Sequence, residues 1–208
     1  MKREAEIKEL LINNTVRLIA EGGFEKATVK DITKCGGDLP DLKMNDVYIY
    51  RIFGSKENLY KAAFARLDSD LFYEIRNAYQ IAIADKSATC FRDIVFKFFE
   101  VAWKFIMGNE ANCRCYVRYY YSVYFCGASQ EAHHNHFENI ASKISVVFKD
   151  EADVEAILHS VFTALLSFAI HSYNGDLEDN EMNRPHIFNV LYCMMATYFK
   201  DDLSGVKL

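Results

Sequence analysis

Proline is nearly absent from this chain, and its absence constrains the fold more than any other feature. Among 208 residues only Pro40 and Pro185 are proline, and nine are glycine. Sandwiches and barrels need such turn residues at regular short spacing. Because 51% of the residues are hydrophobic, the chain can bury a sizeable core and need not be disordered. We therefore expect an all-α protein.

Targeting and redox features of the sequence favour the cytoplasm. The first residues, MKRE, are not followed by an apolar stretch of the signal-peptide type, and later apolar runs are interrupted by charges or are too short to span a membrane. The six cysteines lack the dense spacing of a disulfide scaffold. We expect a cytoplasmic protein with no membrane partner. Its reduced thiols would be Cys35, Cys90, Cys113, Cys115, Cys126 and Cys193.

Charge is distributed unevenly along the chain, whose formal net charge is -5. Residues 1–66 carry twelve Lys and Arg against ten Asp and Glu, a net charge of +2. Residues 67–208 carry twelve against nineteen, a net charge of -7. Only the N-terminal part could face nucleic-acid phosphates. We expect two domains, 1–66 and 67–208.

The N-terminal part is predicted to contain short, well-capped helices. A first helix is expected over residues 4–21, ended by Gly22 and Gly23. Thr28 and Asp31 have the spacing of a capping box, in which a hydroxyl and an acidic side chain satisfy the free N–H groups of a first helical turn. A second helix should therefore begin at Thr28.

A loop and two further helices are expected next. Residues 36–43 combine two glycines, a proline and acidic side chains, which is typical of a loop. Asn45 is a good N-cap for a third helix, Gly54 ends it, and Ser55 caps a fourth. The fourth helix is long and amphipathic, with an apolar stripe made of Leu59, Ala63, Leu67, Leu71 and Ile75.

The remaining chain is helical throughout by its periodicity. Five segments are expected, at residues 89–107, 112–126, 131–148, 152–173 and 185–200. The last two should form a helical hairpin that pairs with its copy in a four-helix homodimer interface. The predicted interface residues are Val154, Ile157, Leu158, Val161, Leu165, Phe168, Ile187, Val190, Leu191, Met194 and Tyr198.

Two stretches of the N-terminal part resemble a known family. Residues 21–32 (EGGFEKATVKDI) and 49–59 (IYRIFGSKENL) are similar to the N-terminal signature of TetR-type transcription regulators. The resemblance implies a three-helix helix-turn-helix domain followed by a helical domain that binds ligand and dimerises, with about nine helices in all. It also implies a ligand-responsive repressor that binds a palindromic operator, with a small-molecule effector and double-stranded DNA as partners. The alternative is a helical dimeric interaction or ligand-binding protein that has lost operator binding.

The resemblance assigns DNA-binding roles to particular residues. Thr28 and Lys56 resemble the helix-start residues that contact phosphates, and Tyr50 resembles a tyrosine that reaches the DNA backbone. The second short helix of such a head lies in the major groove, where side chains on or beside it can contact base edges. The predicted DNA-binding set is Thr28, Lys43, Asn45, Asp46, Val47, Tyr48, Tyr50, Arg51 and Lys56.

One segment departs from the family pattern. About six extra residues, Asp38 to Lys43, lie between the second and third helices, where the family usually has a short turn. Asp38 and Asp41 would repel phosphates if they faced the duplex. This insertion puts the register of the base-reading helix in question.

Aromatic residues are dense in the first part of the predicted ligand-binding domain. Some could line a cavity for a flat or hydrophobic molecule, with tyrosine hydroxyls to orient it, and the alternative is core and dimer packing. The predicted ligand-binding residues are Phe99, Trp103, Tyr116, Tyr119, Tyr120, Tyr124 and Phe162.

Other polar clusters have both a functional and a simpler structural interpretation. Arg114 and Arg118 share a helix face and could meet an anionic ligand, although a pair of solvated or salt-bridged arginines is the preferred explanation. His134 and Glu138 have i, i+4 spacing compatible with a metal, but no further ligands follow at metal-site spacing, so no metal is expected. Cys113-x-Cys115 could sense oxidants, or be small core residues.

No motif indicates catalysis. The sequence contains no nucleophile motif, phosphate loop or metal-site spacing that an enzyme would use. We therefore expect no enzymatic activity, no catalytic residues and no cofactor.

Overall fold

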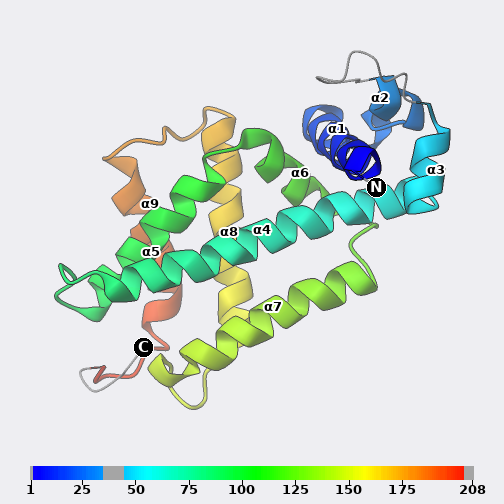
Figure 1. The fold of residues 1–208 in the computed structure, drawn as a ribbon. Coiled ribbons are helices and arrows are strands. Elements are labelled where there is room, and N and C mark those ends of the chain that lie inside the picture. Colours follow the sequence, from blue (N-terminus) through cyan, green and yellow to red (C-terminus); the bar gives the residue numbers. More distant parts are fainter. Residues whose placement is uncertain (1, 35–44, 204–208) are drawn as a thin grey trace. The chain divides into compact units, whose positions relative to one another are not determined.

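The computed structural model describes residues 2–34 and 45–203, and within these ranges the secondary-structure elements are helices (Figure 1). The helices are α1 (Lys2–Lys26), α2 (Val29–Lys34), α3 (Val47–Phe53), α4 (Lys56–Ala84), α5 (Phe91–Ile106), α6 (Glu110–Tyr120), α7 (Ala128–Ile144), α8 (Val154–Tyr173) and α9 (Asn183–Ala196), with a short 3-10 helix η1 (Ser145–Val147). The predicted all-α class and helix number are confirmed. The predicted Asp38 to Lys43 insertion lies outside the described residues.

The chain folds into two compact units that are not continuous in sequence. Unit 1 comprises Met1–Asp70 and Asn109–Gln130, and unit 2 comprises Leu71–Gly108 and Glu131–Leu208. The domain boundary expected after residue 66 lies close to Asp70, where the first segment of unit 1 ends. The return of residues 109–130 to unit 1 could not be read from the sequence, because it depends on which distant helices pack together.

Unit 1 is built around α1, which packs against α2 and α6. Its apolar centre is formed by five side chains that are each 0% exposed: Leu11, Ile19, Ile32, Ile49 and Leu59. Burying each such side chain contributes about 1.5–3 kcal/mol relative to leaving it in water. The centre therefore holds the short helices α2 and α3, which are too short to be stable alone.

The predicted stop at Gly22-Gly23 is a break in α1. Gly23 has φ 74° and ψ -170°, which is outside the helical region, and a further turn continues to Lys26. A positive φ of this size strains any residue with a Cβ, so glycine suits the position. The break turns the chain toward α2.

Two helices differ from their predicted ranges for local reasons. The segment expected at 112–126 ends at Tyr120, because Ser122 Oγ donates to Tyr119 O (2.7 Å) and accepts from Tyr124 N (3.1 Å), replacing helical hydrogen bonds. The segment expected at 185–200 ends at Ala196. After it, Phe199 pairs with Phe148 in an isolated antiparallel bridge.

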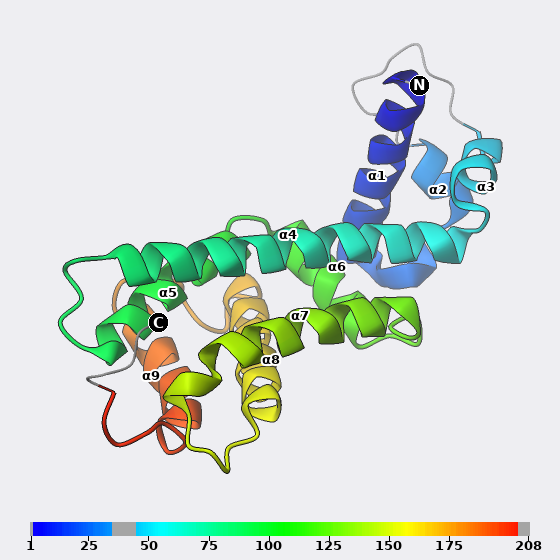
Figure 2. The same cartoon turned by 60° about the horizontal axis from the view of Figure 1, so that its bottom comes forward.

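Unit 2 contains the remaining helices, and in it α8 packs against α9 (Figure 2). Near the bridge, Val147, Phe148, Ile157 and Phe199 form a buried cluster. The cluster joins the end of α7, the start of α8 and the end of α9. It therefore fixes one end of the helical hairpin that was predicted for residues 152–200.

Candidate functional site

Two sites can be described, one in each unit, and the first is the α2–α3 pair of unit 1. The predicted capping box at the start of α2 is confirmed: Thr28 Oγ1 accepts from Asp31 N (3.2 Å) and donates to Asp31 Oδ2 (2.6 Å). These bonds, with Thr28 the largest contributor, lower the pKa of the Asp31 carboxyl. Asp31 therefore stays ionised at the positive end of α2.

The start of α3 is held by two adjacent polar side chains. Asn45 Oδ1 accepts from Val47 N at 3.1 Å, as its predicted capping role requires. Asp46 Oδ1 lies 3.2 Å from Thr33 Oγ1 of α2. The carboxylate of Asp46 is therefore engaged in joining the two helices, which answers why an acidic residue precedes the expected base-reading helix.

α3 is anchored on one side and exposed on the other. Ile49 is 0% exposed, whereas Val47 is 64% and Tyr50 55% exposed, and Arg51 is also exposed. Positions 47, 50 and 51 are related by i, i+3 and i+4, so they share one face of the helix. The Arg51 guanidinium lies 4.9 Å from the centre of the half-buried Tyr48 ring, a cation–π contact that orients it.

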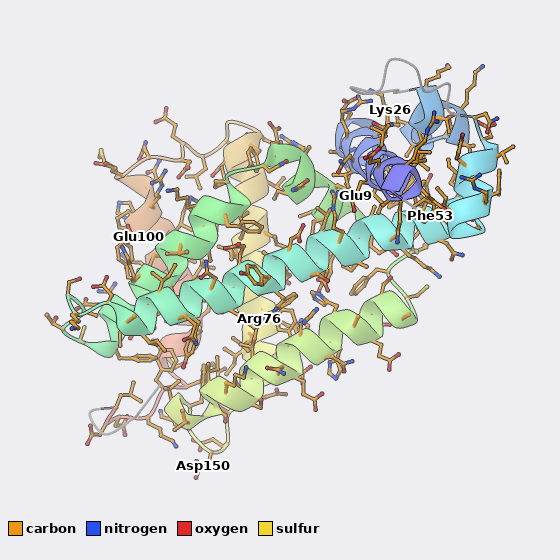
Figure 3. All side chains as sticks on the ribbon, viewed as in Figure 1. Glu9, Lys26, Phe53, Arg76, Glu100 and Asp150 are labelled. Carbon is orange, nitrogen blue, oxygen red and sulfur yellow. The ribbon has the colours of Figure 1, made fainter. Side chains whose placement is uncertain are left out.

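A tight turn links α3 to α4 and places Lys56. Phe53, labelled in Figure 3, ends α3, and Gly54 follows with φ 78°, its N–H donating to Tyr50 O at 2.9 Å. Ser55 Oγ accepts from Asn58 N at 3.1 Å and so caps α4 as predicted. Lys56 stands in the first turn of α4, where backbone N–H groups and an ammonium together favour an anion such as phosphate.

Tyr60 fastens this turn to the rest of unit 1. Its hydroxyl donates to Ala27 O at 2.6 Å, just before α2, and the Lys56 ammonium lies 5.5 Å from its ring centre. Burial raises the pKa of Tyr60 to about 12, so the hydroxyl remains a donor. Tyr60 therefore contacts both the residue before Thr28 and the side chain of Lys56, the two residues that are predicted to contact phosphates.

The predicted DNA-binding residues thus fall into two groups. Those that present side chains outward are Thr28, Asn45, Val47, Tyr50 and Arg51, all exposed, together with the half-buried Tyr48 and Lys56. Asp46 is exposed but tied to α2 through Thr33. Lys43 lies outside the described residues.

The second site is an apolar cavity inside unit 2. Its volume is about 250 Å³, and α4, α5, α7, η1, α8 and α9 all contribute to its wall. One wall is the α5 face made of Phe91, Ile94, Val95 and Phe98, at i, i+3, i+4 and i+7. The periodicity of this face is visible in the sequence, but periodicity alone does not tell whether a face meets core or cavity.

Two cationic side chains border the cavity. Arg76 of α4 (Figure 3) and Lys143 of α7 are its charged lining residues, and both are exposed. Among the residues that the structure describes, neither forms an ion pair with a carboxylate. The cavity is therefore apolar inside with positive charge at its edge.

The aromatic residues predicted to bind ligand lie elsewhere. Tyr116, Tyr119, Tyr120 and Tyr124 belong to unit 1. The three in unit 2, Phe99, Trp103 and Phe162, are buried, and none of the seven lines the cavity. Trp103 Nε1 donates to Asp179 Oδ1 at 2.9 Å, which occupies the polar end of its ring.

The predicted dimer residues are distributed between the core and the surface of unit 2. Ile157, Ile187 and Leu191 are buried within the chain. Val190 and Tyr198 are 50% and 45% exposed. The others, which are half-buried, are Val154, Leu158, Val161, Leu165, Phe168 and Met194.

Comparison with solved structures identifies the class of fold. The chain is similar to a TetR family transcription regulator from Marinobacter aquaeolei VT8, with TM-score 0.72 and 16% identity, over 93% of this chain and 98% of that one. It is also similar to the multidrug binding protein EbrR complexed with imidazole, with TM-score 0.65 and 10% identity, over 95% and 97%. A third similar structure is the fatty acid degradation regulator FadR from Bacillus halodurans, with TM-score 0.61 and 16% identity, over 96% and 99%.

The chain has the fold of the TetR-family transcription regulators, as the resemblance of residues 21–32 and 49–59 predicted. No sequence profile of a known family matches the chain, and no curated protein sequence does.

Proposed function

We propose that this chain is a DNA-binding transcription regulator of the TetR type, whose affinity for its operator is lowered by a small molecule bound in unit 2. The observation that carries the proposal is the exposed face of α3. The side chains of Val47, Tyr50 and Arg51 are exposed on this face, and the buried Ile49 anchors the helix behind them. A helix presented in this way can enter the major groove.

The residues around α3 support a division of labour. Thr28 and Lys56 stand at helix starts and would contact phosphates, which fixes the orientation of the head without reading sequence. Arg51, oriented by the Tyr48 ring, would donate to a base edge, and Val47 would contact a thymine methyl group. Removing a base contact should therefore reduce specificity, whereas removing a phosphate contact should weaken binding to all sequences.

Homodimerisation is part of the proposal and rests on α8. Among the described helices, α8 alone is long and apolar enough to cross a membrane by length and composition, and 17% of its most apolar 18-residue window is buried within the chain. The apolar side chains of Val154, Leu158, Val161, Leu165 and Phe168 on this helix are only half-buried within the chain, so a partner could cover the rest of their surface. A second copy, paired through α8 and the exposed Val190 and Tyr198 of α9, would cover it and bring two heads to one palindromic site.

The cavity in unit 2 favours a particular chemistry for the effector. Its apolar wall would hold a hydrocarbon group, and Arg76 and Lys143 at its edge would pair with an anionic group. The volume of about 250 Å³ is slightly below that of drug-sized sites, which points to a small amphiphile. Because α4 begins in unit 1 and ends in unit 2, it can couple ligand binding to the head.

DNA binding can be tested by fluorescence anisotropy with the region upstream of the chain's own gene. Wild-type protein should bind with an affinity that falls steeply as salt rises, and Arg51→Ala should lose about 1–3 kcal/mol of discrimination against unrelated DNA. Lys86→Ala, which removes one exposed positive charge between α4 and α5, is the matched control. Equal discrimination by wild type and Arg51→Ala would overturn the base-reading role of Arg51, and no binding to any upstream segment would leave only the alternative of a helical interaction or ligand-binding protein.

The effector class can be tested separately with decanoate and decanol, which differ in charge and share a chain length. Decanoate should bind more tightly by titration calorimetry and release the DNA, and Arg76→Gln with Lys143→Gln should remove the preference. Equal binding of both probes would contradict the anionic class while leaving DNA binding intact.

A further inference from the structure

We propose that His134 of α7 with Glu155 and His159 of α8 forms a binding site for a divalent transition-metal ion of the zinc type. One ligand atom from each of the three side chains lies within 4.8 Å of the other two. His134 Nδ1 is 2.7 Å from Glu155 Oε1, and His159 Nε2 is 3.7 Å from the same oxygen. The three side chains converge from two helices of unit 2, and nothing in the proposed regulatory function requires them to do so.

The separations suit a single ion. Zinc bonds of about 2.0–2.2 Å in a tetrahedral site put ligand atoms roughly 3.3–3.5 Å apart. The two separations from Glu155 Oε1, 2.7 Å to His134 Nδ1 and 3.7 Å to His159 Nε2, lie on either side of this value, and the ligand atoms of the two histidines are within 4.8 Å of each other. An ion therefore needs the His134–Glu155 pair to open and the other separations to close. Small rotations of partly exposed side chains achieve this, since the side chains of His134, Glu155 and His159 are 54%, 33% and 32% exposed.

Packing between α7 and α8 holds the His159 ligand in place. The Phe137 ring of α7 stacks on the His159 ring with a centre-to-centre distance of 3.9 Å and an interplanar angle of 16°. Glu155 and His159 are related by i, i+4 on α8, so they face the same side of that helix. Figure 2 shows α7 and α8 crossing in unit 2. A fixed ring orientation is what a preorganised ligand requires.

The donor set selects the metal. Two imidazoles and one carboxylate suit Zn²⁺, Co²⁺ and Ni²⁺, whereas Mg²⁺ and Ca²⁺ prefer oxygen donors only. Three protein ligands leave a fourth position for water.

Along the sequence, His134 and Glu138 have i, i+4 spacing compatible with a metal, and so do Glu155 and His159, but the two pairs lie on different predicted helices. In the structure, His134 of α7 lies beside Glu155 and His159 of α8. The sequence could not show that these two helices bring the three side chains together. An ion at this site would join α7 to α8 and stabilise unit 2, whether or not the chain binds DNA.

The site can be tested with tag-free full-length protein titrated with Co²⁺ and Zn²⁺. We expect one Co²⁺ per chain with the visible absorption of low-coordinate cobalt, displaced by Zn²⁺, and a thermal midpoint raised by Zn²⁺. His134→Gln, Glu155→Gln and His159→Gln should each weaken Zn²⁺ binding by about tenfold or more in calorimetry. Circular dichroism of each variant shows whether it remains folded, and the exposed His134 is the safest position to change.

His171→Gln is the matched control. His171 Nδ1 lies 3.1 Å from Asp176 Oδ2, so it forms a similar imidazole–carboxylate pair near the other end of α8, without a third ligand. This variant should bind Zn²⁺ as the wild type does. The proposal is overturned if folded wild type takes up no stoichiometric Co²⁺ or Zn²⁺. It is equally overturned if the three site variants bind as wild type, or if His171→Gln loses binding to the same extent.

Discussion

Tyr116 of α6 donates a hydrogen bond of 2.8 Å to Asp68 of α4, and both residues are almost fully buried in unit 1. Burial first, and then the charge of Asp68, raise the pKa of Tyr116 well above its ordinary value of 10.0. The tyrosine therefore remains protonated and donates at all physiological pH values. This hydroxyl, on a residue predicted to bind ligand, links α6 to α4.

Tyr116→Phe removes this donor and leaves the buried carboxylate with one hydrogen bond fewer. The free energy of unfolding should fall by about 1–3 kcal/mol, since loss of a buried partner costs the desolvation of the group that remains. Chemical denaturation followed by circular dichroism measures it. Tyr121→Phe, at a ring that is 63% exposed, is the control and should change stability little. A loss of similar size in both variants would show that the Asp68 bond is not the cause.

Cys113 and Cys115 should be unreactive in the folded protein. Both are buried, and burial raises the pKa of each thiol to about 12, so the thiolate that reacts with oxidants and alkylating agents is scarcely populated. Native-state alkylation with iodoacetamide and peptide mapping should label the exposed Cys90, Cys126 and Cys193 first. Early labelling of Cys113 or Cys115 would favour the oxidant-sensing alternative considered for the Cys-x-Cys pair.

Helix positions and caps could be predicted because they depend on neighbouring residues. Thr28 and Asp31 form their capping box, and Asn45 receives the Val47 N–H, as spacing and residue type implied. The exposed face of α3 also follows from the pattern around Ile49. Such features need no knowledge of distant packing.

Features that join distant segments could not be predicted. The cavity lies where α4, α5, α7, α8 and α9 meet, and the sequence does not tell which apolar faces leave a space between them. The aromatic density near Tyr116 and Trp103 was visible, but whether these rings line a cavity or fill a core depends on partners such as Asp68 and Asp179. The same holds for His134, whose nearest carboxylate is on another helix.

Gly54→Ala should weaken both stability and DNA binding. Gly54 has φ 78° between α3 and α4, and a Cβ there would meet Asn58 Nδ2 at 3.7 Å, an ordinary contact. The cost therefore comes from the backbone and should be about 1–2 kcal/mol. Gly54→Asn should cost less, because asparagine tolerates this conformation. Denaturation and DNA titration of the two variants test this, and equal losses for Ala and Asn would point to a steric origin instead.

Asp179 should make stability depend on acidic pH. Its two hydrogen bonds from Arg184, at 2.6 and 3.0 Å, and then that from Trp103, lower the pKa of the carboxyl below its ordinary value of 3.8. Because the folded-state pKa is the lower one, the contribution is fully present above about pH 4 and is lost as the pH falls through the folded-state pKa. Wild type should thus exceed Asp179→Asn in stability at pH 6 and approach it at strongly acidic pH.

Trp103 is the only tryptophan in the chain, so its fluorescence reports on this interaction directly. Denaturation curves at a series of pH values should converge for wild type and Asp179→Asn as the pH falls. Asp176→Asn, at an exposed carboxylate of the same loop, is the control. A difference between wild type and Asp179→Asn that stays constant with pH would show that the side chain acts by shape and not by charge.

Filling the cavity should separate ligand response from DNA binding. Val95 lies on the α5 wall, and Val95→Phe would place a ring in the apolar space where a hydrocarbon group is proposed to bind. Filling existing space causes less strain than enlarging a residue in a close-packed core. The variant should bind upstream DNA as wild type does, lose decanoate binding in calorimetry, and no longer release DNA when decanoate is added. Val146→Phe, at a 42% exposed position outside the cavity wall, should keep the response. If Val95→Phe still binds decanoate with wild-type affinity, the effector site lies elsewhere in the chain.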